Sequence, residues 1–256
     1  MPGDATRGAA ERSSGLDEIP LNHHLYRMCG RFGLDTPKKH LAEQFDLTKE
    51  PSYAPRYNIA PTQMIGAILA HPESGSPAFR MLKWGLVPSW AKDTNVGTRL
   101  INARAETVDQ KPSFRTAFRQ RRCLIPASHF FEWQRLPDGT TQPHCIRLKD
   151  DTTMGFAGIW EHWSTPESNG SPPTSIFSCS ILTTTANELM APIHGRMPVI
   201  IPVESYSIWL KGDAVQVLPL LEPCPAESLE AWPIPHRVNS AKNDDHSIMV
   251  RQEENP

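Results

Sequence analysis

The sequence lacks the features of a secreted, membrane-spanning or zinc-binding protein. No apolar run approaches the roughly 20 residues that a bilayer-spanning helix needs, and residues 1–27 have no apolar core of the kind a secretory signal contains. The five cysteines are scattered without a CxxC pair, and no histidine lies at metal-ligand spacing. We therefore expect free thiols in a reducing, cytoplasmic compartment, with no metal ion and no cofactor.

The sequence also lacks a large excess of charge of either sign. The formal net charge is -2, which argues against a protein that binds polyanions over its whole surface. A local basic face is still compatible with this value. Such a face is indicated by a run of cations within two dozen residues, at Arg99, Arg104, Lys111, Arg115, Arg119, Arg121 and Arg122. Such a run is usually a solvated helix surface, and the more specific, functional interpretation is a strip that binds phosphates.

Proline is abundant, with 25 residues spread along the chain, and this favours short elements joined by irregular loops. We predict one α+β domain with a curled, barrel-like, mostly antiparallel sheet and short peripheral helices. Strands are expected at 65–70, 79–84, 122–125, 130–134, 144–148, 156–160, 176–182, 199–201 and 231–234. Helices are expected at 36–45, 113–119, 186–190, 203–210 and 214–220, with an exposed loop at 164–174.

Residues 1–27 differ from the rest of the chain, being rich in Gly, Ala, Ser and charged residues. They are expected to be a disordered leader or a mis-assigned start, before one domain over 28–256. Met28, which stands directly before Cys29, is interpreted as a second, hidden start of the protein. If the chain began at Cys29, that residue would carry a free α-amine next to its thiol, and this pair condenses with an aldehyde into a thiazolidine ring. The alternative is a buried structural cysteine.

Two further residues have settings suited to proton transfer. Glu132 lies among aromatic residues that would partly desolvate it and raise its carboxyl pKa. Strand alternation alone slightly favours the other reading, in which Glu132 points to solvent. His194 lies in a constrained loop, where catalytic groups often occur, although a surface histidine is as plausible there.

Extended and aromatic segments provide candidate binding groups. Asn102 and Arg104 alternate on one face of an extended segment. Trp84 and Trp90 bracket a tight loop with Gly and Pro. An indole in such a loop is more often part of the core, but beside arginine and asparagine it can stack on an unpaired base.

These motifs together resemble one family, the SOS response-associated peptidase (SRAP) family, which includes abasic-site processing proteins. The resemblance runs from residue 28 toward the C-terminus. It is carried, in the family's order, by MCGRF (28–32), RYNIAP (56–61), WGLVP (84–88), NARAET (102–107), FEW (131–133), LTTTAN (182–187), HGRMP (194–198) and VNS (238–240).

The resemblance implies a covalent reaction with abasic single-stranded DNA. Cys29 would be the nucleophile that forms a thiazolidine crosslink with the ring-opened sugar, Asn102 would hold that sugar, and Glu132 and His194 would move protons. The DNA contacts it implies are Asn58, Pro61, Trp90, Arg104, Lys111, Thr183 and Arg196. The implied protein is a monomer associated with DNA, with no metal and no membrane partner.

Two departures from the family pattern matter. The chain has residues before Met28, and a peptide bond on the nitrogen of Cys29 would remove its amine. Translation from Met28 or removal of the leader, possibly by the protein itself, would restore it. His129 stands where related sequences often have glycine. The alternatives are a cysteine peptidase that uses Cys29 and His194, or a non-covalent single-strand binding module.

Overall fold

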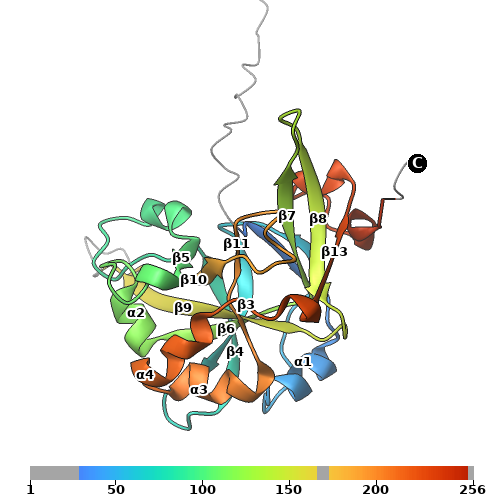
Figure 1. Ribbon diagram of the computed structural model, residues 1–256. Helices are drawn as coiled ribbons and strands as arrows, with labels where there is room; N and C mark the ends of the chain where they lie inside the picture. Colours follow the sequence, from blue (N-terminus) through green and yellow to red (C-terminus); the bar gives the residue numbers. More distant parts are fainter. Residues whose placement is uncertain (1–28, 166–172, 253–256) are drawn as a thin grey trace, which may run out of the picture.

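The structure is a computed structural model that describes residues 29–165 and 173–252 (Figure 1). The leader prediction and most of the predicted loop at 164–174 lie outside the described residues. The strands are β1 (Arg31–Leu34), β2 (Arg56–Ile59), β3 (Met64–Ala70), β4 (Pro77–Trp84), β5 (Asn102–Arg104), β6 (Arg122–Ala127), β7 (His129–Arg135), β8 (Thr141–Leu148), β9 (Met154–Ser164), β10 (Ser175–Thr185), β11 (Arg196–Pro198), β12 (Ile200–Ile201) and β13 (Leu229–Pro233). The helices are α1 (Lys38–Gln44), α2 (Arg115–Gln120), α3 (Tyr206–Lys211) and α4 (Ala214–Val217).

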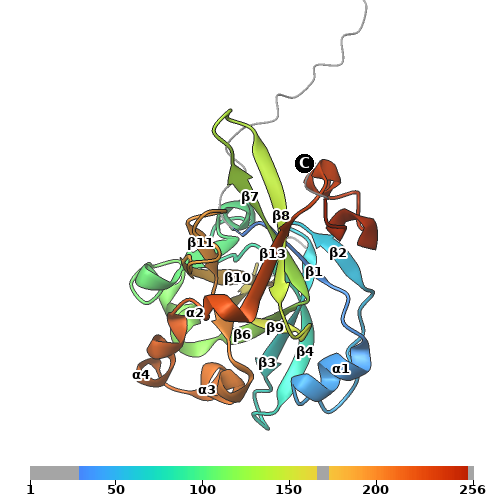
Figure 2. The ribbon, with the colours of Figure 1, turned by 45° about the vertical axis from the view of Figure 1, so that its right-hand side comes forward.

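The predicted α+β class with a barrel-like sheet is confirmed. One sheet runs β11-β10-β4-β3-β6-β9-β12, and an additional pairing of β9 with β10 closes its central strands into a ring. A second sheet has the order β13-β8-β7-β1-β2. All pairings are antiparallel except those of β10 with β4 and with β5. The short helices lie around the barrel, and the hairpin β7–β8 rises beyond it beside β13 (Figure 2).

Two apolar clusters lie on opposite faces of strand β7. On one face, Phe130 makes an edge contact with Phe156, which also contacts Phe32, in the main core. On the other face, Phe131 packs with Cys145 and Trp232 beneath the C-terminal segment. This alternation follows from the period of two along a strand. It places Glu132 on the same side as Phe130 and the main core.

Several sequence predictions need correction. Residues 186–190 form turns and not a helix, because the Asn187 side chain accepts from the Met190 amide and donates to the Cys224 carbonyl, while Ala186 bonds Gly195. These contacts satisfy the backbone without a second helical turn. Strands β1, β2 and β11 were not predicted, since each has only three or four residues and no clear alternation.

Candidate functional site

Cys29 and Glu132 meet where the chain enters β1 beside β7. The backbone nitrogen of Cys29 donates a hydrogen bond to Oε1 of Glu132 over 2.5 Å. Strand β1, directly after Cys29, pairs with β7 so that Arg31 lies opposite Phe131, and this register brings the two residues together. Cys29 is 5% exposed and Glu132 is 3% exposed. The solvent-facing alternative for Glu132 is therefore wrong.

Burial controls the protonation of both groups. It raises the pKa of the Glu132 carboxyl above its ordinary value, and the nearby His194 charge and the hydrogen bonds from Cys29 offset part of this rise. Burial also raises the pKa of the Cys29 thiol well above its usual range, and the charge of Glu132 adds to the effect, whereas the charge of Arg196 opposes it. The site thus contains a neutral thiol beside a carboxyl that exchanges protons more readily near neutral pH than an exposed one.

His194 completes a compact cluster of titratable groups. Its Nδ1 lies 3.9 Å from Oε2 of Glu132, and the side chain is 25% exposed. The same nitrogen lies 3.1 Å from the carbonyl oxygen of Arg196 and 3.2 Å from its amide nitrogen, which fixes the ring at the entrance to β11. Cys29, Glu132 and His194 are therefore brought together from segments far apart in the chain.

The next group of predicted residues lies on strand β10 and on its neighbour β5. Asn102 and Arg104 lie on β5, which pairs with β10 in parallel, with Asn102 opposite Ile181 and Arg104 opposite Thr183. Asn102 is half-buried, Arg104 is exposed, and Ala103 between them is buried, so the predicted alternation is present. The Thr183 side chain is fully buried. Its carbonyl oxygen accepts a hydrogen bond of 2.6 Å from Nη2 of Arg196.

Asn58 occupies a structural position. Its side chain is fully buried, and its Nδ2 donates to the carbonyl oxygens of Val238, Ser240 and Asn243. Its Oδ1 accepts from Nη1 of Arg31, whose guanidinium also donates to the carbonyls of Val238 and Asn239. The C-terminal segment thereby holds the strand that follows Cys29.

The remaining predicted contacts lie nearer the surface. Trp90 is 63% exposed, whereas Trp84 is a core residue whose indole donates to the Ile101 carbonyl. Pro61 is half-buried and Lys111 is exposed. Of the two indoles in that loop, only Trp90 offers a free face.

The basic run divides into structural and exposed members. Arg122 is 7% exposed and donates to the carbonyls of Trp209, Phe118 and Gly212. Arg121 pairs with Glu161 over 2.7 Å. The other cations of the run are exposed, namely Arg99, Arg104, Lys111, Arg115 and Arg119. These five are the cations of the run that a phosphate-binding strip, which stays a prediction, could use.

Sequence reasoning missed one residue beside the site. Glu106 binds the guanidinium of Arg196 with both carboxylate oxygens. The signal available was its place in the motif that also contains Asn102 and Arg104. Its partner on β11 could not be read from spacing, because the two residues are 90 positions apart.

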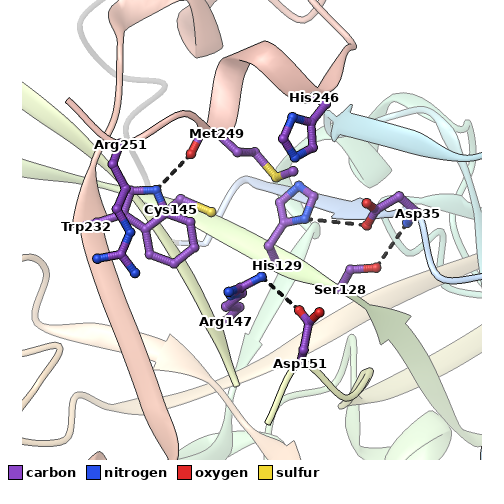
Figure 3. Close-up of a pocket in the computed structure, with 10 residues that line it drawn as sticks. All are labelled: Asp35, Ser128, His129, Cys145, Arg147, Asp151, Trp232, His246, Met249 and Arg251. Atoms are coloured by element: carbon purple, nitrogen blue, oxygen red, sulfur yellow. Dashed lines mark hydrogen bonds and ion pairs between the residues drawn. The ribbon is translucent and has the colours of Figure 1, made fainter. Parts of the chain in front are cut away.

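A cavity of about 330 Å³ is lined by ten residues that include His129, Cys145 and Trp232 but neither Cys29 nor Glu132 (Figure 3). His129 forms part of its wall, with Nδ1 3.8 Å from Oδ1 of Asp35 and Nε2 3.0 Å from the Tyr57 carbonyl oxygen. The ring lies over Gly33, where an added Cβ would be 2.2 Å from Nε2. His129 is the first residue of strand β7, the strand that also carries Glu132, so it does not lie in a loop.

Burial lowers the pKa of His129 below its ordinary value, and this gives a stability prediction. The folded protein binds fewer protons than the unfolded chain below the unfolded pKa of about 6.5, so stability should fall as pH drops below that value. His129→Gln should flatten this loss by up to about 1.4 kcal/mol per pH unit within the window between the two pKa values. Urea unfolding at pH 7.5 and 5.5 measures it. His144→Gln, at a second histidine whose pKa burial lowers, should flatten the loss in the same direction. An unchanged slope in His129→Gln would contradict the prediction.

Residues 29–165 and 173–252 contain no group of three metal-ligating side chains that could hold an ion. Within the same ranges, no helix has the length and apolar character needed to cross a membrane.

Three known proteins illustrate what this chain is similar to. The abasic site processing protein YoqW of Bacillus subtilis is 42% identical over 228 residues, covering 87% of this chain and 99% of that protein. The abasic site processing protein HMCES of Gallus gallus is 28% identical over 240 residues, covering 81% of this chain and 69% of that protein. A crystal structure of a protein from Bacteroides thetaiotaomicron superposes with a TM-score of 0.75 at 25% identity, covering 88% of this chain and all of that one.

The motifs of the site lie within one continuous match. Residues 28–241 fit the family described as SOS response associated peptidase (SRAP), and they include Cys29, Asn102, Glu132 and His194. Together with the extent of the match to YoqW, this shows that the chain belongs to the SRAP family and is related to abasic site processing proteins.

Proposed function

We propose that this chain, in a form whose first residue is Cys29, forms a covalent thiazolidine crosslink with abasic sites in single-stranded DNA and so shields the lesion. One observation carries the proposal. The nitrogen that would become the α-amine lies 2.5 Å from a buried carboxyl whose pKa is raised by burial. The names of the relatives, which are abasic site processing proteins, support the substrate class.

The proposed reaction has two steps, formation of a Schiff base and closure of the ring. The α-amine, with an ordinary pKa of about 7.7 to 8.0, adds to the sugar aldehyde, and loss of one water gives a Schiff base. The thiol then adds to the imine carbon, and its proton passes to the nitrogen, which closes the ring. In the first step Glu132 carries a proton from the amine to the leaving oxygen, and in the second it carries the thiol proton to the nitrogen, so both steps use one carboxyl.

His194 and Asn102 assist this chemistry in the proposal. His194 is partly open to solvent, and its Nδ1 lies 3.9 Å from Oε2 of Glu132, a separation that one bridging water can span for proton transfer. It can therefore refill or empty the proton on Glu132 between steps. Asn102, half-buried on β5, supplies an amide for the sugar hydroxyl.

The DNA contacts divide by exposure. Arg104, Lys111 and Arg196 would bind phosphates, with Trp90 and Pro61 as stacking or wedge surfaces for unpaired bases. Asn58 and Thr183 are fully buried, so we assign them to positioning: Asn58 holds Arg31, and Thr183 holds Arg196. One chain is sufficient for this site, since all the groups named come from a single polypeptide.

Self-cleavage before Cys29 is a second candidate activity, and the backbone favours it. Cys29 has a φ of 35°, a left-handed conformation that costs a non-glycine residue about 1–2 kcal/mol. Attack of the thiol on the preceding carbonyl would give a thioester and release the nitrogen of Cys29, and Glu132 would carry the thiol proton to that nitrogen. Water would then hydrolyse the thioester and free the thiol.

Comparison of two forms of the protein tests both activities. The form that begins at Cys29 should give a heat-stable adduct with single-stranded DNA that contains one abasic site, and none with intact DNA. The full chain should give an adduct only to the extent that intact mass shows the segment before Cys29 to be lost. Absence of any adduct from the form that begins at Cys29 would refute the proposed function, and an unchanged mass of the full chain would count against self-cleavage.

A further inference from the structure

Glu106 holds a cation that the proposed function assigns to DNA. It follows β5, and its carboxylate binds Nη1 and Nη2 of Arg196, the latter at 2.9 Å. In the pairings of β10 with β5 and with β11, Arg104 lies opposite Thr183 and Arg196 lies opposite Thr185. The ion pair therefore reaches across β10 and joins the strands on its two sides.

The geometry determines which donors of Arg196 are available. Glu106 takes one N–H from each terminal nitrogen, which is the forked edge that binds a carboxylate or a phosphate in bidentate fashion. A second N–H of Nη2 is given to the Thr183 carbonyl. Nε is buried and has no hydrogen-bond partner among the described residues. A phosphate that binds Arg196 by its fork must therefore replace Glu106.

Glu106 is well placed for such an exchange. Its side chain is 45% exposed, whereas that of Arg196 is only 15% exposed, so the carboxylate can turn toward water while the guanidinium stays in place. Arg104, the other predicted phosphate contact nearby, also lowers the pKa of Glu106, after the larger effect of Arg196. The carboxylate is thus ionised and acts on both cations.

We propose that Glu106 is a positioning residue that occupies the phosphate-binding edge of Arg196 until a DNA phosphate displaces it. The carboxylate keeps the guanidinium aligned and weakens the binding of intact DNA, so that long residence on DNA depends on the covalent step. The inference rests on the proposed function in taking Arg196 as a phosphate contact.

Glu106→Gln tests this directly. The amide keeps the size of the side chain but removes the charge that competes with phosphate. Affinity for an undamaged single-stranded oligonucleotide should rise about three- to tenfold, as expected for release of a partly exposed ion pair. The slope of log affinity against log salt should steepen by about 0.7, the value for one additional phosphate contact on a single strand. Fluorescence anisotropy over a range of salt concentrations measures both.

A matched control is provided by Glu230. Glu230 lies on β13, and its carboxylate accepts hydrogen bonds from Arg147 and Arg251. Glu230→Gln therefore removes the same charge from a carboxylate that is also bound by arginine. It should leave the salt slope at the wild-type value. Glu106→Asp, which retains the competing charge, should also stay close to wild type. In an Arg196→Gln background, Glu106→Gln should have no further effect on affinity.

The outcomes separate the inference from the proposed function. Tighter binding with a steeper slope that disappears in the Arg196→Gln background supports the competition. Unchanged or weaker binding by Glu106→Gln, or equal tightening by Glu230→Gln, overturns it. If Glu106→Gln does not fold, Glu106→Ala, which also removes the competing charge, should show the same tighter binding and steeper slope, and unchanged or weaker binding by that variant overturns the competition. A wild-type protein that neither binds single-stranded DNA nor forms an adduct would instead refute the proposed function.

Discussion

Cys29→Ala, made in the form that begins at residue 29, should abolish the heat-stable adduct with abasic single-stranded DNA. The variant keeps its α-amine, so it can still form a Schiff base, but it has no thiol to close the ring. Hydrolysis of the imine during heating should then release the DNA. Denaturing gel electrophoresis before and after heating measures the loss, and borohydride reduction should trap the remaining imine as a stable product.

Another buried cysteine gives the control for this variant. Cys145 is 0% exposed and belongs to the cluster on the outer face of β7, away from Glu132. Cys145→Ala should lose packing contacts while retaining the adduct. Retention of the heat-stable adduct in Cys29→Ala would contradict the thiazolidine mechanism, and loss in both variants would point to a folding defect.

Glu132→Gln should slow adduct formation by about 10²- to 10⁴-fold, the usual contribution of a positioned acid-base group. The amide can still accept the hydrogen bond from the Cys29 nitrogen, so the geometry should persist. It cannot carry a proton between the thiol, the amine and the leaving water. The comparison therefore isolates proton transfer from positioning.

The pH dependence gives a second measure of the same role. Burial raises the pKa of Glu132, so its base form appears only above the ordinary carboxyl range, and the wild-type rate should rise with pH through that raised value. Glu132→Gln should lose this limb and keep the one from the α-amine near about 7.7 to 8.0. Single-turnover rates between pH 4.5 and 9 would show it.

A matched carboxyl elsewhere controls for loss of a buried charge. Glu161 is 6% exposed on β9 and is paired with Arg121. Glu161→Gln should change stability without changing the rate at fixed pH. An unaltered rate and pH profile in Glu132→Gln would exclude Glu132 as the proton carrier.

Local pattern was sufficient for much of the fold. The hairpin of β3 and β4 was predicted because two apolar runs flank a segment rich in turn residues, and the structure pairs Ile65 with Leu82 and Ile68 with Phe79. Strands β1 and β2 were missed because they exist through their partners: β1 has β7 on one side and β2 on the other. In such short segments, tertiary pairing outweighs local propensity.

The site was only partly predictable for the same reason. The aromatic residues around Glu132 indicated a desolvated carboxyl, but its direction depends on Cys29, which lies 103 positions away. The burial of Asn58 and Thr183 could not be read from their motifs, because it depends on the C-terminal segment and on β11. The shared carboxylate of Glu106 was hidden in the same way.

The hydrogen bonds between Arg31 and the C-terminal segment determine when the strand after Cys29 can be fixed during synthesis. The carbonyls of Val238 and Asn239, which hold Arg31, are 207 and 208 positions further along the chain. A ribosome must therefore translate a further 207 residues after Arg31 before Val238 can fix the strand after Cys29. The nascent chain carries its cysteine from the start but cannot hold it against Glu132 in this way until these late residues have emerged.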